Sequence, residues 1–376
     1  MVRQISQGHL DFIGAARPSI ADPFLPNKIR QGRIDDIREC IGCNVCYAHN
    51  SRGAAIRCTQ NPTMGEEWRR GWHPERAPNA HKDELVLIIG GGPSGMEAAV
   101  TLGRRGYRVM LAESSRQLGG RVNSESQLPG LQEWARVRDW RLNQLQQLPQ
   151  VEVYLQSRLT AADALCVKAD HIFIATGATW RDDGIGIHRD APLQITHGAS
   201  VLTPDQIVSG QTPTGKVVIF DDDVYYMSSV LALRLRQAGC DVILITPHSL
   251  VGPWTQNTEE LELNHRQLLQ QGVTLVLNQL VSGFDGQQVL SHCVFSGKEY
   301  QQPADHLLTV TGRIPNDELY LALLDQTKQQ HEIPQLTRIG DCDAPGIIAH
   351  AVYSGHAAAR GLGETEQIIL REVTQL

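Results

Sequence analysis

The sequence predicts an α/β protein in which one Rossmann-like nucleotide-binding domain is interrupted by a second Rossmann-like domain. Three observations lead to this fold class. Apolar strands alternate with helical stretches from residue 84 onward, which is typical of parallel sheets. A glycine-rich turn follows the first of these strands, and four closely spaced cysteines precede it. With 376 residues, 41% of them hydrophobic, the chain has the length for two or three domains with buried cores.

The first 37 residues predict a single βα unit rather than a domain. A short helix over VRQISQGHL is followed by a strand, DFIGAA, from Asp11 to Ala16. A parallel strand needs neighbours on both sides, so one such unit cannot bury its own strand. We therefore expect this segment to be the docking edge of a larger body or the tail of a domain outside this sequence.

Residues 38–80 predict an iron–sulfur loop and a packed connector. Cys40, Cys43 and Cys46 form C-x-x-C-x-x-C, and Cys58 follows after eleven residues. Four thiolates are what a [4Fe–4S] cluster requires. Structural zinc more often takes its ligands as two separated pairs, so the triplet favours iron–sulfur. We therefore expect a redox role based on single-electron transfer.

The run LVLIIGGGPSG places G-x-G-x-x-G between an apolar strand, Leu85–Ile89, and a helix. Gly90 allows a tight turn, Gly92 lets the backbone approach a pyrophosphate, and Gly95 lets the helix pack close to the strand. Glu113 ends the next strand, Tyr107–Ala112, at the position that accepts ribose hydroxyls. An acid there disfavours the 2′-phosphate of NADP. The motif therefore predicts a dinucleotide or an ADP-type ligand.

Further fragments favour a flavin-type over a nicotinamide-type domain. Gly120 and Arg121 belong to an LGGR run soon after Glu113, and IATGA ends a later strand. Asp341 lies in IGDCDAP at a strand end, where flavoproteins hydrogen-bond the ribityl chain. We predict that this domain covers residues 81–200 and 314–376. Its other expected elements are a helix near 131–147, strands 151–155, 171–176 and 337–341, and a final helix near 345–361.

The second α/β unit, residues 201–313, predicts the shape of a nicotinamide-binding domain without its site. The expected order is strand 216–220, helix 225–238, strand 242–246, helix 258–271 and strand 273–277. The position that should be rich in glycine reads DDDVYYMSS. Asp221, Asp222 and Asp223 would repel a pyrophosphate, and Tyr225 and Tyr226 would fill its space.

Composition and charge argue against nucleic-acid binding, membrane insertion and secretion. A net charge of −7 without a basic run gives no indication of nucleic acid or of an anionic membrane surface. No apolar run approaches the length of a membrane span, and MVRQISQGHLDF lacks the apolar core of a signal peptide. Eight cysteines, four of them in one motif, fit a reducing compartment, so we expect the cytoplasm.

With these motifs the sequence resembles the C-terminal half of the trimethylamine, dimethylamine and histamine dehydrogenase family. These are old-yellow-enzyme-like flavoproteins with a [4Fe–4S] cluster, and they are related to 2,4-dienoyl-CoA reductase. The resemblance extends over essentially the whole chain. It is carried by the cysteine loop, the glycine turn and the runs GAARPSIADPFLP, RCTQNPTMGEE, LGGRVNSESQLPGLQEW, IATGATWRDDG, LTPDQIV, VTGR and IGDCDAPGIIAHAVYSGHAAAR.

The resemblance implies a mechanism and partners. An FMN on a TIM barrel oxidises an N-methylated amine, electrons pass singly to the cluster, and an electron-transferring flavoprotein collects them. Residues 1–37 would then be the last βα unit of that barrel, with Arg17 helping to bind the FMN phosphate. The barrel would come from a separate subunit or from a missing N-terminal domain, and a homo-oligomer is expected. The first α/β domain would hold FAD or ADP, and catalytic residues cannot be assigned.

Two alternatives stay open at this point. The chain could be an NAD(P)H-dependent FAD and iron–sulfur module of the enoate or 2,4-dienoyl-CoA reductase type, although DDDVYYM departs from the intact second glycine motif of those reductases. It could also be a non-catalytic assembly subunit, or a truncated fragment, in which the cluster and the nucleotide are structural.

Overall fold

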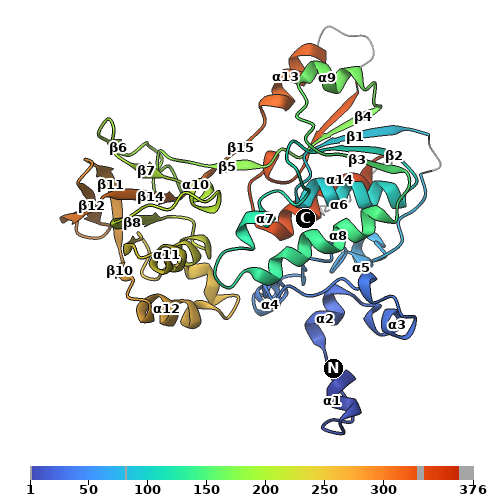
Figure 1. Ribbon diagram of the computed structural model, residues 1–376, viewed down its shortest axis with the longest axis horizontal. Helices are drawn as coiled ribbons and strands as arrows, with labels where there is room; N and C mark the ends of the chain where they lie inside the picture. Colours follow the sequence, from blue (N-terminus) through green and yellow to red (C-terminus); the bar gives the residue numbers. More distant parts are fainter. Residues whose placement is uncertain (1, 81–82, 328–333, 364–376) are drawn as a thin grey trace, which may run out of the picture.

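The computed structural model describes residues 2–80, 83–327 and 334–363, and Figure 1 shows two α/β lobes with the N-terminal segment projecting below one of them. The parts of the predicted first domain at 81–82, 328–333 and 364–376 lie outside the described residues. None of the helices in the described part of the chain has the length and apolarity that a membrane crossing requires.

The N-terminal 80 residues contain helices and loops, and no strand is assigned among those described here. The predicted strand over Asp11–Ala16 is wrong: residues 11–15 pair with no other strand, and a helix begins at Ala16. A strand forms only against partners, and the side chain of Phe12 is 90% exposed. The helices are α1 (Val2–Ser6), α2 (Ala16–Ala21), α3 (Leu25–Arg30), α4 (Val45–Ser51) and α5 (Glu67–Arg70), with a 3₁₀ turn η1 (Ile34–Asp36).

The nucleotide unit is built on a parallel sheet whose order within the described residues is β16-β4-β1-β2-β3. Its strands are β1 (Leu85–Ile89), β2 (Arg108–Ala112), β3 (Val151–Tyr154), β4 (His171–Ile174) and β16 (Gln335–Arg338). The helices are α6 (Pro93–Arg104), α7 (Val122–Glu125), α8 (Arg136–Gln146), α9 (Ala161–Cys166), α13 (Glu318–Thr327) and α14 (Ile348–Gly361), with the 3₁₀ turns η2 (Gln132–Ala135) and η4 (Gly340–Cys342). The predicted return of the chain to this sheet is confirmed, because β16 pairs in parallel with β4.

Strand β1 is buried on both faces, which is why its sequence is continuously apolar. Val86 and Ile88 pack with residues of α6 and α14 on one face. Leu87 and Ile89 pack on the other face with α9 and with Leu323 of α13. Figure 1 shows the same division, with α9 and α13 on the side of the sheet opposite to α8.

The second unit contains another parallel sheet, of order β10-β9-β8-β14-β7, and a mixed, mainly antiparallel sheet that the sequence did not predict. The parallel strands are β7 (Val201–Leu202), β8 (Lys216–Asp221), β9 (Asp241–Ile245), β10 (Thr274–Val276) and β14 (His306–Val310). The additional sheet contains β6 (Gln194–Ile195), β11 (Gln279–Phe284), β12 (Gln288–Cys293) and β13 (Glu299–Pro303). Helices α10 (Pro204–Val208), α11 (Met227–Gln237) and α12 (Leu261–Gln270) and the 3₁₀ turn η3 (Pro253–Gln256) complete the unit.

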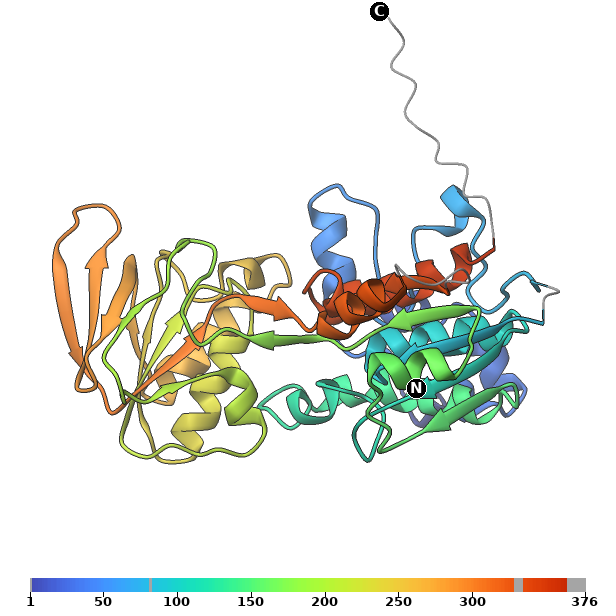
Figure 2. The same ribbon diagram turned by 90° about the horizontal axis from the view of Figure 1, so that it is seen from above.

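Two short antiparallel strands connect the units. β5 (Ala178–Trp180) pairs with β15 (Arg313–Pro315), and Figure 2 shows these strands running between the lobes. Because β6 pairs with β11, residues 194–195 belong to the second unit, which therefore begins before the predicted boundary at residue 200.

Candidate functional site

The four motif cysteines surround one small cavity. Cys40 and Cys43 lie on a turn whose Gly42 has φ +74°, Cys46 lies in the first turn of α4, and Cys58 comes from the following loop. All four line the cavity together with Ile41, Asn44, Thr59, Gln60, Ile20 and Arg17. The amide of Gly42 donates to the Cys40 sulfur at 3.4 Å, and the hydroxyl of Thr59 lies 3.1 Å from the Cys43 sulfur. The sequence prediction that these cysteines form one site therefore agrees with their placement.

The spacing of the sulfurs distinguishes between a single metal ion and a cluster. Around a tetrahedral zinc with Zn–S bonds of about 2.3 Å, the sulfurs lie roughly 3.8 Å apart. No three of the cysteine sulfurs lie within 4.8 Å of one another. Among the described residues, three possible metal ligands come this close at His188, Asp222 and His248, which lie elsewhere in the chain. The four motif sulfurs are therefore spaced more widely than the ligands of one tetrahedral zinc ion.

Burial makes this pocket unfavourable for isolated thiolates. It raises the pKa of Cys43 to about 12, and it also raises the pKa values of Cys46 and Cys58. Neighbouring cysteines add to the effect at Cys43 through mutual repulsion. Four thiolates are therefore stable here only with a cationic group between them. The donor set and its burial fit an iron–sulfur cluster.

Arg17 lies beside the cysteines. It belongs to α2, lines the cysteine cavity, and donates from Nη1 to Oδ1 of Asn44. Asn44 in turn donates from Nδ2 to the carbonyl of Thr258 in the second unit at 2.8 Å. The predicted role of Arg17 in binding an FMN phosphate stays a prediction.

The glycine turn has the geometry expected for nucleotide binding. Gly90 has φ +112°, and a Cβ there would lie 2.3 Å from the carbonyl oxygen of Ala175. A Cβ at Gly95 would lie 1.9 Å from the carbonyl oxygen of Gly90, so only glycine lets α6 pack this closely. Gly92 is the N-cap of α6, and a Cβ there would meet nothing within 4 Å. The helix N-terminus is therefore open to a ligand on its exposed side.

Glu113 is held against the glycine turn. Its Oε2 accepts from the amide of Gly91 at 2.7 Å, while Oε1 accepts from the amide and the hydroxyl of Ser115, both at 2.7 Å. The carboxylate lines the same cavity as Gly90 and Gly92. Its position at the end of β2 is the one that the sequence predicted, and its contact with ribose stays a prediction.

One cavity of about 1080 Å³ joins the predicted nucleotide residues. It is lined by Gly90, Gly92, Glu113, Gly120, Arg121 and Asp341, and by Asp223, Tyr225, Tyr226 and Trp254 of the second unit. Its volume lies just above the usual range of roughly 300–1,000 Å³ for small-molecule and cofactor sites. Gly95 packs behind the turn rather than lining the cavity.

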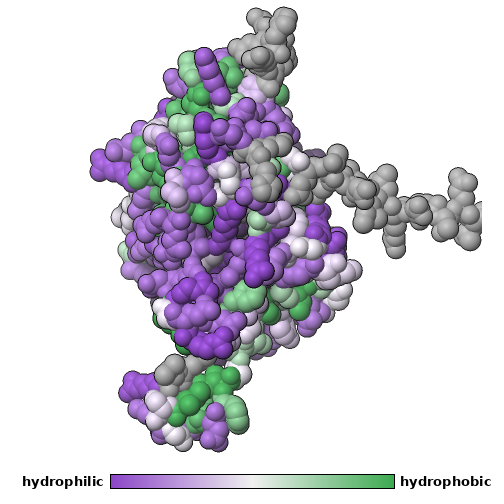
Figure 3. Space-filling view, turned by 90° about the vertical axis from the view of Figure 1, so that its right-hand side faces the viewer, coloured by the Kyte–Doolittle hydropathy of each residue, from purple (hydrophilic) through white to green (hydrophobic). Residues whose placement is uncertain are grey.

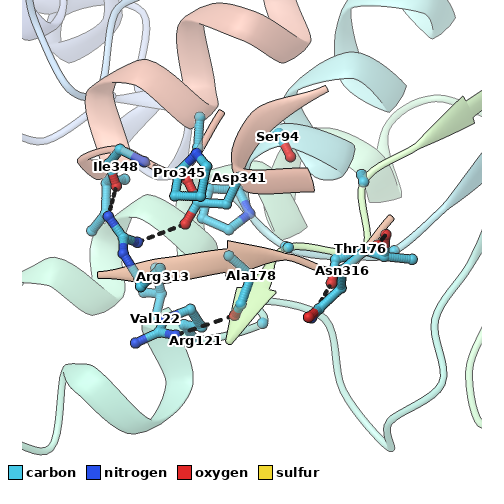
Figure 4. A pocket seen from close by; sticks show the side chains of 18 of the residues that line it. Ser94, Arg121, Val122, Thr176, Ala178, Arg313, Asn316, Asp341, Pro345 and Ile348 are labelled. Atoms are coloured by element: carbon cyan, nitrogen blue, oxygen red, sulfur yellow. Dashed lines mark hydrogen bonds and ion pairs between the residues drawn. The ribbon is translucent and has the colours of Figure 1, made fainter. Parts of the chain in front are cut away.

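Arg313 and Asp341 form an ion pair on the cavity wall, as Figure 4 shows. Arg313 Nη1 lies 2.8 Å from Asp341 Oδ2, and Nη2 donates to the carbonyl of Gly346 at 2.8 Å. Asp341 lies in η4, directly after β16, as expected for a residue at a strand end. Arg313 was not predicted as a site residue, although it lies in the VTGR run that carried part of the resemblance.

Arg121 connects the two units across the cavity. Its Nε lies 2.9 Å from Glu125 Oε1, and its Nη1 lies 3.0 Å from Asp205 Oδ1 in α10. Burial works against the charged guanidinium, but the two carboxylates outweigh it and raise the pKa of Arg121. Gly120 precedes it with φ +54°, and a Cβ there would lie 3.0 Å from the Cα of Gly92. The LGGR turn therefore packs against the glycine turn.

The second unit has no glycine turn at the equivalent position. Asp221, the last residue of β8, and Asp222 are fully buried, and helix α11 begins after Tyr226. The rings of Tyr225 and Tyr226 contact each other and also contact Trp254 and Trp134. Burial raises the pKa of Asp221 to about 7 and that of Asp223 to about 8. Acidic and aromatic side chains therefore pack at the end of β8 in place of a glycine turn, and the exclusion of a pyrophosphate stays a prediction.

The chain matches the family model described as pyridine nucleotide-disulphide oxidoreductase over residues 84–355. It is 38% identical to dimethylamine dehydrogenase of Hyphomicrobium sp. (strain x), over 97% of this chain and 54% of that protein. The structure of histamine dehydrogenase from Rhizobium sp. 4-9 superposes with a TM-score of 0.96 at 45% identity, covering 100% of this chain and 59% of that chain. The 6-hydroxypseudooxynicotine amine oxidase of Pseudomonas geniculata N1 gives 0.94 at 46% identity, over 96% of this chain and 54% of that chain.

The chain thus spans about half the length of the curated relatives it matches. These relatives are named as dehydrogenases and a demethylase, and the matching domain is an oxidoreductase domain of flavin-dependent enzymes. The chain therefore belongs to the pyridine nucleotide-disulphide oxidoreductase family, and within it to the flavoprotein oxidoreductases of the trimethylamine, dimethylamine and histamine dehydrogenase group.

Proposed function

We propose that this chain is the electron-transfer part of an iron–sulfur flavoprotein that dehydrogenates amines. Its own residues would hold a [4Fe–4S] cluster through Cys40, Cys43, Cys46 and Cys58, and FAD or ADP in the cavity of the nucleotide unit. When bound, such a cluster accepts and releases one electron at a time. The observation that carries the proposal is that the four motif cysteines line one small cavity, with no three of their sulfurs within 4.8 Å of one another.

The site residues would position the groups rather than react. The turn at Gly90 and the N-terminus of α6 present backbone amides to a pyrophosphate, and Glu113 supplies a carboxylate at the ribose position. The cysteine cavity is separated from the nucleotide cavity by a thin wall. Tyr225 and Tyr226 line the nucleotide cavity on one side and share a small space with Cys43 on the other.

The exposed N-terminal segment supports a partner barrel. Ile5, Leu10 and Phe12 expose 45%, 47% and 90% of their surface, and Figure 3 shows hydrophobic side chains gathered on this projecting end. Exposed apolar groups of this kind mark contact surfaces. We propose that this segment docks on an FMN-bearing barrel, in the same or a separate polypeptide, and that an electron-transferring flavoprotein is the acceptor.

Anaerobic reconstitution with iron and sulfide tests the cluster. We expect about four iron and four labile sulfide per chain, with an electron paramagnetic resonance signal after reduction. Mass spectrometry of the released nucleotide separates FAD from ADP. A preparation that binds one zinc ion and no iron would overturn the proposal.

The reductase alternative predicts that the chain oxidises NADH or NADPH, whereas the proposed electron-transfer function predicts that it does not. Because Asp221, Tyr225 and Tyr226 are packed where a pyrophosphate would lie, we expect no NADH or NADPH oxidation by the reconstituted chain. Steady turnover of either cofactor, with reduction of bound FAD, would favour the reductase reading.

A further inference from the structure

Three possible metal ligands meet in the second unit, and none of them lines the cysteine cavity or the nucleotide cavity. Asp222 follows β8, His248 lies in the turn after β9, and His188 comes from the loop between β5 and β6. Strands β8 and β9 are parallel neighbours, so their carboxyl ends lie at one edge of the sheet. One ligand atom of each residue lies within 4.8 Å of the other two.

Asp222 is fixed in place by the His188 loop. Its side chain is fully buried, and it accepts from the backbone amide of His188 at 2.8 Å and lies 2.7 Å from His188 Nδ1. The loop can approach this closely because residue 186 is glycine: a Cβ there would lie 2.5 Å from Asp222 Oδ2. The carboxylate and one imidazole are therefore pre-positioned.

His248 has a nitrogen that the fold does not satisfy. Its ring packs edge-on against that of His188, with centroids 4.6 Å apart. Nε2 is buried and has no hydrogen-bond partner among the described residues. Buried polar atoms normally have a partner, so this unpaired nitrogen is available as a ligand atom.

A simple ion pair between His188 and Asp222 explains only part of this arrangement. It accounts for the buried carboxylate, but it leaves the His248 nitrogen without a partner and gives no reason for placing two imidazoles side by side. Two imidazoles and a carboxylate are the ligand set of zinc and related divalent ions, with water in the remaining position. The His188 side chain is 38% exposed, which provides an entry path and room for that water.

We propose that His188, Asp222 and His248 bind a divalent transition-metal ion of the zinc type. The ion would fasten the His188 loop to the carboxyl ends of β8 and β9, at the edge where a nicotinamide-binding domain would hold its cofactor. This site is independent of the iron–sulfur cluster and of the function proposed above.

Titration with Co²⁺ tests the proposal on the anaerobically reconstituted chain. We expect one equivalent of Co²⁺ to bind and to give visible ligand-field bands without a thiolate-to-cobalt charge-transfer band. Co²⁺ bound by cysteines would show that charge-transfer band, so the two kinds of binding can be told apart. Both H188Q and H248Q should weaken this binding at least about tenfold. H197Q, which changes an exposed histidine elsewhere in the second unit, should leave it unchanged.

Zn²⁺ provides a second measurement that does not depend on colour. It should raise the melting temperature of the wild type and of H197Q, but not of H188Q or H248Q, because only the folded site binds the ion. Circular dichroism confirms that the variants are folded, and the exposed position of His188 makes H188Q the safer of the two. The proposal is overturned if Co²⁺ binds only with thiolate bands, or if it binds equally well to both variants.

Discussion

Arg141 and Glu97 form a buried ion pair that joins the nucleotide turn to the cysteine loop. Arg141 Nη2 lies 2.8 Å from Glu97 Oε2, and the two side chains are 0% and 3% exposed. Arg141 also donates from Nη1 to Oε1 of Gln60 at 3.0 Å, two residues after Cys58. Glu97 belongs to α6, the helix that begins at the glycine turn. One guanidinium group therefore fixes the position of the glycine turn relative to the cysteine loop.

Removing one partner of this pair should be costly. Glu97→Gln leaves the Arg141 charge buried without its counter-ion, and we expect a loss of about 3–5 kcal/mol in the free energy of unfolding. Urea denaturation measures the change. The double substitution of Glu97→Gln with Arg141→Met removes both charges and should restore part of the loss. A single variant as stable as the wild type would contradict this account.

The same pair predicts a dependence of stability on acid. Burial acts to raise the pKa of Glu97, but Arg141 and His356 outweigh it and hold the pKa at about 2, below the ordinary 4.5. A carboxyl group whose pKa is depressed on folding stabilises the protein above its unfolded pKa. This stabilisation is lost as the pH falls from about 4.5 toward 2. The wild type should therefore lose more stability over this range than the double variant does, as measured by urea midpoints.

The nucleotide unit was predictable because its signals are local. Leu85–Ile89 is a continuous apolar run that ends at a glycine turn, and β1 has these bounds in the structure. The strand predicted over Asp11–Ala16 failed because strand formation depends on a partner, which the local sequence does not reveal. The additional sheet was missed for a related reason: in β13, EYQQP, exposed positions alternate with half-buried ones, and the segment contains no apolar run.

The candidate sites, too, could be predicted only where their residues lie close together in the sequence. Four cysteines and three glycines form motifs within short segments, so the sequence could identify them. Arg141, Glu97 and Gln60 are far apart in the sequence, and a charged residue in a helix is more often on the surface. Their contact exists only after α6 and α8 have packed. The ligands His188, Asp222 and His248 likewise meet only at the edge of a folded sheet.

Two glycine substitutions should separate folding from nucleotide binding. Gly95→Ala places a Cβ 1.9 Å from the carbonyl oxygen of Gly90, so we expect a loss on the order of 1–3 kcal/mol in stability. Gly92→Ala meets no atom within 4 Å and has φ −74°, so the fold should keep its melting temperature. Its added methyl group should instead hinder the pyrophosphate. Thermal unfolding and ADP binding by calorimetry check both; unchanged ADP affinity in Gly92→Ala would count against the site.

Arg121 should stabilise the contact between the two units. Replacing it with methionine removes its ion pairs and leaves the buried carboxylate of Glu125 and the partly buried carboxylate of Asp205 without their cation. We expect a loss of about 1–3 kcal/mol and faster proteolysis of the segments that connect the units. Arg116→Met, a change of the exposed arginine five residues earlier, is the matched control. Equal proteolysis rates in the two variants would show that Arg121 does not hold the units together.

Cys58 should be essential for iron binding although it lies apart from the other three cysteines. In the fold it completes the wall of the cavity that Cys40, Cys43 and Cys46 form on the tight turn and α4. Cys58→Ser leaves a buried hydroxyl, which is a poor ligand for iron, so the cluster should be lost or become labile in air. Cys166→Ser changes an exposed cysteine in α9 and should leave iron content unchanged. Iron and sulfide analysis after anaerobic reconstitution measures the difference, and a Cys58→Ser protein with full iron content would remove this residue from the ligand set.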